Sequence, residues 1–227
     1  SVDAARFLAQ ATFGARSVES IDAVKTLGYA TWLDREFAKP ATAHLDYLQQ
    51  VQGNGERVDE QHAYEAIWQQ MFDADAQLRT RIAFALSQII VISNIAPDQD
   101  TWALASWMDM LKRNAFGNYR QLLEDATLHP AMGYFLNMLR NAKEDPARGR
   151  LPNENYAREV LQLFSIGLVE LNADGTPRLG ADGRGIPTYD QTVVEGFAKV
   201  FTGWSFGGGN VADADAFHHG GENWVIP

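Results

Sequence analysis

The chain has 227 residues, 46% of them hydrophobic, which is enough to bury the core of one large domain or two small ones. Its 19 basic and 29 acidic residues give a net charge of −10, which argues against a nucleic-acid partner. The absence of cysteine excludes disulfides, zinc–thiolate sites and thiol nucleophiles. No run approaches the ~20 apolar residues of a membrane-spanning helix, so we expect no membrane span.

Apolar residues recur at helical spacing along most of the chain. Glycine, proline, serine or asparagine marks where most of these segments begin or end. The predicted helices cover residues 2–12, 18–27, 29–38, 58–73, 77–93, 101–114, 119–128, 130–140, 153–167 and 189–202. The segment over 77–93 is apolar around most of its circumference, which predicts that it lies at the centre of the fold.

A short stretch near 168–188 has a different character. Two Asp-Gly pairs, at Asp174 and Asp182, lie eight residues apart between short alternating segments, which predicts a small β-hairpin insert. Residues 205–227 are rich in glycine and polar side chains and predict an irregular tail. We therefore predict a mainly α fold, a multi-helix orthogonal bundle with this insert, over a single domain of residues 1–227.

The helix over 153–167 carries the main candidate site. Glu154 and Arg158 lie four residues apart in the orientation that favours an ion pair. Together with Glu159, they could carry out acid–base chemistry or hold an anion, and these three are the candidate catalytic residues. Asn153 and Asn155, on the same polar stretch, are candidate binding residues. The alternative is an ordinary solvated surface with one ion pair, and the pattern alone favours this alternative.

Histidines and tryptophans suggest further sites. His218, His219 and Glu222 are weak metal candidates, because adjacent histidines in a loop point in different directions, and we expect no metal. No phosphate-binding loop or dinucleotide fingerprint is present, so no cofactor is expected. A tryptophan could stack on a sugar ring, and Trp204 and Trp224 are free to do so. The tryptophans within apolar helical stripes are predicted to belong to the core: Trp32, Trp68, Trp102 and Trp107.

Five stretches in order along the chain resemble the bacterial domain-of-unknown-function family numbered 1800. They are residues 5–14, 28–33, 78–83, 153–159 and 201–204, and the string Asn-Glu-Asn-Tyr-Ala-Arg-Glu at 153–159 is the most diagnostic. Many members have histidines where this chain has residues 85–88 and Phe164, and a glutamate at Gln162. A mechanism that used those histidines would therefore not apply to this chain.

The resemblance implies an exported, mainly helical protein without an established activity, placed in the periplasm or outside the cell. Members are often encoded beside an exported sulfatase-like protein, which is a possible partner. The resemblance corresponds to the N-terminal half of a longer family domain, so the C-terminal remainder of that domain is a second expected partner. These are expectations from the family alone.

Two functions are compatible with the sequence. A non-catalytic exported scaffold, or a domain that binds a partner or polymer, is favoured because no nucleophile or metal triad is visible. The alternative is an exported hydrolase in which Glu154, Arg158 and Glu159 line a pocket. In either case we expect their polar helix face to be at least partly buried against the last helix or the remaining half of the domain.

Overall fold

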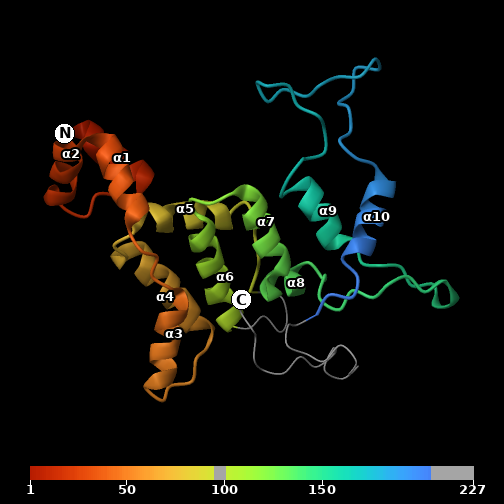
Figure 1. Ribbon diagram of the computed structural model, residues 1–227, viewed down its shortest axis with the longest axis horizontal. Helices are drawn as coiled ribbons and strands as arrows, with labels where there is room; N and C mark the ends of the chain where they lie inside the picture. The colour runs from red at the N-terminus through yellow and green to blue at the C-terminus, as the bar shows by residue number, and fades with distance from the viewer. Residues whose placement is uncertain (95–100, 206–227) are drawn as a thin grey trace. The chain divides into compact units, whose positions relative to one another are not determined.

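The computed structural model describes residues 1–94 and 101–205 and is mainly α-helical (Figure 1), which confirms the predicted fold class. Its contacts divide the chain into two compact units, Ser1–Ala126 (unit 1) and Thr127–Pro227 (unit 2). The prediction of a single domain stays a prediction. The predicted irregular tail, apart from its first residue, lies outside the described residues.

The helices of unit 1 follow one another with short connections. They are α1 (Val2–Ala11), α2 (Val18–Ala38), α3 (His44–Gly53), α4 (Glu60–Asp73), α5 (Gln77–Ser87), α6 (Thr101–Asn114) and most of α7 (Tyr119–Leu128). Unit 2 contains α8 (Pro130–Phe135), a 3-10 turn (Pro146–Arg148), α9 (Asn155–Gln162) and α10 (Gln191–Val200). Among the described residues, no helix is long and apolar enough to cross a membrane.

Local signals explain where several helices begin and bend. The side chains of Ser17 and Asp59 accept hydrogen bonds from backbone amides in the first turns of α2 and α4. The two helices predicted over 18–38 are the two halves of α2, which is kinked at Gly28 with φ 73°. Positive φ costs glycine nothing, so the kink falls on the residue where the sequence predicted a break.

Helix α3 was not predicted. It begins after Ala43, whose side chain cannot accept a hydrogen bond. The N-cap position therefore lacks the polar residue that usually indicates the start of a helix. The acceptor for its first amides is Asp109 of α6, which is 65 residues further along the chain. The helix is therefore started by a tertiary contact.

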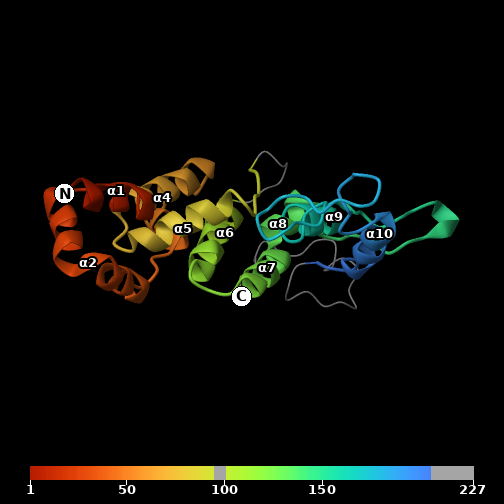
Figure 2. The same cartoon turned by 90° about the horizontal axis from the view of Figure 1, so that it is seen from above.

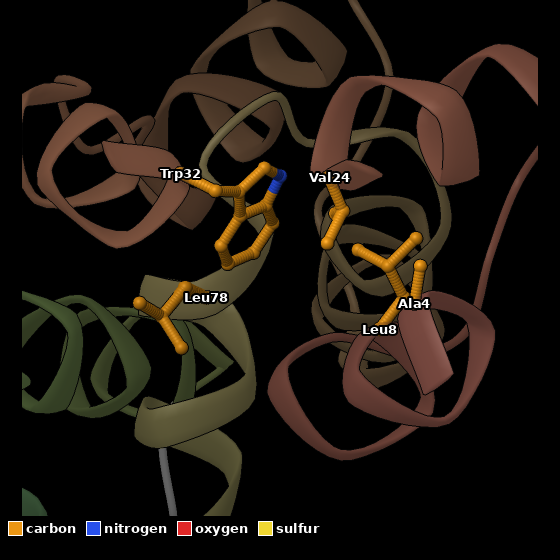
Figure 3. Close-up of a cluster of buried hydrophobic side chains, with 5 residues drawn as sticks. All are labelled: Ala4, Leu8, Val24, Trp32 and Leu78. Atoms are coloured by element: carbon orange, nitrogen blue, oxygen red, sulfur yellow. The ribbon is translucent and has the colours of Figure 1, made fainter. Parts of the chain in front are cut away.

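The first two helices pack against α5 around a buried apolar cluster (Figure 3). Trp32 is 9% exposed and lies in this cluster, as predicted. The cluster contains Ala4, Leu8, Val24, Trp32 and Leu78. Phe7 adds an edge-on contact with the Trp32 ring at a centroid distance of 5.1 Å.

Helix α5 contacts α1, α2, α4 and α6 (Figure 2), as expected of a central helix. Yet α6 is the more enclosed of the two, since every residue from Ala103 to Lys112 is buried. Trp107 of α6 is 1% exposed, which confirms its predicted place in the core. The prediction for Trp68 was wrong, because this residue is 58% exposed on α4.

The predicted β-hairpin insert of unit 2 consists of two successive tight turns joined by isolated antiparallel bridges. The bridges pair Val169 with Pro187, Leu171 with Pro177, and Leu179 with Gly185. In each turn an aspartate accepts a bond from the backbone two residues later, Asp174 from Thr176 and Asp182 from Arg184, both at 3.0 Å. The eight-residue echo in the sequence thus builds the same turn twice.

Candidate functional site

Helix α9 presents part of its apolar side inward, whereas Leu163 at its end is 56% exposed. Tyr156, Ala157 and Val160 are buried, and so is Phe164 just beyond the helix. The Oδ1 atom of Asn153 accepts a hydrogen bond from the backbone amide of Asn155 at 2.9 Å, which satisfies one of the free amides at the helix start. Hydrophobic burial and this local bond therefore fix which residues face the solvent side of α9.

The polar side of α9 joins it to α10, which lies beside it (Figure 1). Arg158 donates to the carboxylate of Glu154 at 2.7 Å, as the four-residue spacing predicted. Gln191 of α10 completes the group. Its amide nitrogen donates to both carboxylate oxygens of Glu154, at 3.0 and 3.2 Å, and its oxygen accepts from Arg158 at 3.2 Å.

This Glu154–Arg158–Gln191 network is half-buried. The side chains of Glu154 and Arg158 are 28% and 40% exposed, so water still reaches part of each. The polar face is therefore partly buried against the last predicted helix, as expected. Gln191 was not predicted, because nothing in the sequence near it points to residues 37 positions earlier.

A second group of hydrogen bonds holds the segment before α9. The side chain of Asn141 donates to the carbonyl of Asn153 at 3.1 Å and accepts from its amide at 2.8 Å. The Asn141 carbonyl also accepts from Gly203, and the Arg140 amide donates to the Trp204 carbonyl, both at 2.8 Å. Asn141 therefore ties the start of α9 to the chain after α10, and sequence reasoning missed it.

The remaining predicted residues stand apart from this network. The side chain of Asn155 is exposed. The indole nitrogen of Trp204 donates to the Val200 carbonyl at 3.2 Å, and Trp204 is 38% exposed, so part of its ring faces solvent. The backbone carbonyl of Trp204 accepts from the Arg140 amide and not from any of the predicted site residues.

Glu159 is placed differently from Glu154. Within residues 1–94 and 101–205, its Oε2 atom is buried and has no hydrogen-bond partner, and the same holds for the hydroxyl of Tyr189. No hydrogen bond or ion pair in this described part of the chain links the Glu159 side chain to Glu154 or Arg158. The structure thus brings together two of the three candidate catalytic residues.

Burial shapes the chemistry of Tyr156, on the inner face of α9. Its hydroxyl shares a hydrogen bond of 2.6 Å with Thr127, and burial raises the pKa of Tyr156 to about 12. The phenol stays protonated at neutral pH, so it anchors the helix and does not serve as a base.

The metal candidates His218, His219 and Glu222 lie outside the described residues, as does Trp224. Among the residues that are described, no cluster of three histidine, aspartate or glutamate side chains could hold a metal ion.

The fold and this region define a mainly helical protein in which a polar motif joins two helices of unit 2. Residues 6–225 match the model of the family described as protein of unknown function (DUF1800), and the chain belongs to this family. No curated protein and no solved structure matches the chain.

Proposed function

We propose that this chain is a non-catalytic binding domain, exported to the periplasm or the cell exterior, that serves as a scaffold for a partner protein or polymer. The observation that carries this proposal is the hydrogen bonding of Glu154. Both of its carboxylate oxygens accept from Arg158 or Gln191, at distances between 2.7 and 3.2 Å. A carboxylate held in this way between two helices contributes to structure, whereas a general base must reach a substrate proton.

Exposed apolar side chains after α9 also favour binding. Five large ones, each at least half exposed, follow the helix or lie in the two tight turns. They are Leu163, Ile166, Leu168, Leu171 and Leu179. Exposed apolar side chains of this kind can be covered by a partner. In this proposal the network holds α9 and α10 together, and the neighbouring segment contacts the partner.

The second candidate function is an exported hydrolase. One observation favours it: the buried Oε2 atom of Glu159 lacks a partner among the described residues. A buried polar atom without a hydrogen bond is costly, and such atoms occur at catalytic sites. In that case Glu159 would act as the acid or base, and the Glu154–Arg158 pair would hold its helix in position.

Two pairs of variants separate the structural role from catalysis. Glu154→Gln and Arg158→Met remove an ion pair that also bonds to α10, and we expect each to destabilise unit 2 by about 1 kcal/mol. Glu170→Gln and Arg178→Met are the matched control, because this pair is partly exposed within the turn segment. Thermal unfolding should show a larger loss of stability for Glu154→Gln and Arg158→Met than for the two control variants. Equal losses would contradict the structural role of Glu154.

Turnover tests the hydrolase alternative directly. The purified chain is incubated with ester, glycoside and peptide substrates, in parallel with Glu159→Gln and, as control, Glu170→Gln. The binding proposal predicts no turnover that depends on Glu159. Hydrolysis that disappears in Glu159→Gln and persists in Glu170→Gln would overturn it in favour of the enzyme.

Location and partners belong to the same proposal, and their support is the family membership. Cell fractionation would find the protein in the periplasm or the medium, and a cytoplasmic protein would refute the location. Co-purification with the C-terminal remainder of the family domain, or with an exported sulfatase-like protein, would test the two expected partners.

A further inference from the structure

Helices α1, α2 and α5 of unit 1 line a small open cavity that contains none of the predicted site residues. Its volume is about 190 Å³, less than the ~300 Å³ at which pockets for drug-sized molecules begin, so it suits a small ligand. Both halves of α2 contribute to the lining, Ala23 before the kink at Gly28 and Trp32 after it. The bend at Gly28 therefore brings two parts of one helix to the same cavity.

Buried side chains form the inner part of this cavity. Leu8, Thr12 and Gln77 line it, and each is less than a tenth exposed. The Thr12 hydroxyl donates to the Leu8 carbonyl at 2.6 Å and accepts from the Gly14 amide at 3.0 Å. The side-chain nitrogen of Gln77 donates to the Ala74 carbonyl at 2.9 Å. These bonds hold the inner wall in one arrangement, so the cavity is formed before any ligand arrives.

The indole N–H of Trp32 is an unused donor in this buried region. Trp32 is 9% exposed and lines the cavity. Figure 3 shows its nitrogen on the side of the ring toward Val24, the residue after Ala23 of the lining. Within residues 1–94 and 101–205, this N–H has no hydrogen-bond partner. A buried indole N–H usually has one, so a molecule that places an oxygen in the cavity would satisfy it.

The charges that line the cavity leave one positive group available. Lys39 pairs with both lining carboxylates, Glu36 and Asp75, so neither carboxylate is free to bind a cation. Arg16 is exposed at the mouth of the cavity, and its guanidinium donates to the neutral carbonyl of Ala74 at 3.0 Å. In the part of the chain that the structure describes, no carboxylate pairs with Arg16. The available charge therefore favours an anion.

We propose that this cavity binds a small organic acid, a monocarboxylate with a short apolar body. The forked donors of Arg16 match the two oxygens of the carboxylate. The Trp32 N–H donates to an oxygen of the same ligand, and Leu8 contacts its carbons. Charges more than about 8 Å away are screened at physiological salt, so the net charge of −10 does not keep an anion out. The cavity lies in unit 1, so this inference is independent of the role proposed for Glu154.

Nuclear magnetic resonance of the isotope-labelled full chain tests the site directly, because each indole N–H gives its own signal. Trp32→Phe identifies the signal of Trp32 by its disappearance. Sodium propionate is the probe, and sodium chloride at the same concentrations is the reference. We expect propionate to produce a saturable shift of the Trp32 signal that chloride does not produce. The same response to both salts, or no response to propionate, would overturn the proposal.

Matched arginine variants separate the cavity from a general attraction of anions. Arg16→Gln and the control Arg35→Gln each remove one positive charge from an exposed side chain, and Arg35 of α2 does not line the cavity. We expect Arg16→Gln to raise the dissociation constant of propionate about tenfold and Arg35→Gln to leave it nearly unchanged. Circular dichroism checks that both variants fold. Equal dissociation constants in the two variants would refute the site.

The donor role of Trp32 has its own test. Trp32→Phe removes the N–H and keeps an aromatic ring in the cluster, and binding is then followed through the backbone amide signal of Gly14. We expect propionate to bind several-fold more weakly to this variant. Binding as tight as in the wild type would overturn the assignment of the N–H to the ligand.

Matched ligands test the chemical class. Propionamide has the shape of propionate without its charge and should bind several-fold more weakly. Alanine adds an ammonium group and should bind no more tightly than propionate, because Lys39 already pairs with both lining carboxylates. Inorganic phosphate lacks an apolar part and should bind more weakly. If any of these three bound more tightly than propionate, the proposal would be overturned in favour of a neutral amide, an amino acid or an inorganic oxyanion.

Discussion

The buried carboxylate of Asp109 offers the sharpest test of how unit 1 is held together. It accepts hydrogen bonds from the His44 amide at 2.7 Å, from the Leu45 amide at 3.1 Å and from the His44 ring at 2.6 Å. The side chains of Asp109 and His44 are 7% and 1% exposed, so water cannot take over these bonds in Asp109→Ala. The first turn of α3 would lose its acceptor.

The expected cost follows from these contacts. Removing one partner from a buried, hydrogen-bonded charge costs roughly 3–5 kcal/mol, and we expect this range for Asp109→Ala. Asp109→Asn keeps one acceptor oxygen and should cost about half as much. Asp59→Ala is the matched control: Asp59 makes the same kind of aspartate–histidine and backbone bonds at the start of α4, but its side chain is 60% exposed.

Hydrogen exchange is the local readout, because the two compact units need not unfold together. Asp109→Ala should speed exchange in α3 strongly and lower the urea midpoint of unit 1. Asp59→Ala should produce a smaller change, confined to α4. If Asp109→Ala were no more destabilising than Asp59→Ala, the reasoning that α3 depends on a buried tertiary cap would be refuted.

Three further predictions concern pH, the site and the turns. Burial lowers the pKa of Lys112 from 10.5 to about 8, so the folded state binds fewer protons than the unfolded state between these values. Stability should therefore rise with pH across this window, and Lys112→Met, compared by urea unfolding at pH 7.5 and 9.5, should lose the rise. Asn141→Ala should destabilise unit 2 by about 2 kcal/mol in thermal unfolding. A smaller loss of stability than in Asn155→Ala would contradict the conclusion that Asn141 ties the start of α9 to the chain after α10. Gly175 has φ 84°, so Gly175→Ala should cost roughly 1–2 kcal/mol, whereas Gly196→Ala, inside α10 with space for a methyl group, should stabilise.

Local patterns predicted much of the architecture. The 3.6-residue periodicity predicted most of the helices, and the Glu154–Arg158 spacing predicted an ion pair that forms at 2.7 Å. The repeated Asp-Gly pairs predicted the turns at Gly175 and Gly183, both of which have positive φ. Each of these features depends on residues that are only a few positions apart in the sequence, so the sequence pattern alone can predict it.

Exposure was harder to predict than helicity. The pattern of α4 placed Trp68 among core residues, because an apolar residue at helical spacing usually faces inward. The helix instead buries Ala63, Ala66 and Met71 and leaves Trp68 in water. Periodicity identifies a helix, but it does not say which side the neighbouring elements cover.

Partners distant in sequence were decided only by the tertiary structure. Asp109 starts α3 from 65 residues away, and Gln191 completes the Glu154–Arg158 network from 37 and 33 residues away. The sequence by itself determined most of the helices, the turns and the ion pair on α9. Whether those polar groups are shared, buried or left open depends on which elements pack together, because a hydrogen bond requires closeness in space and not along the chain.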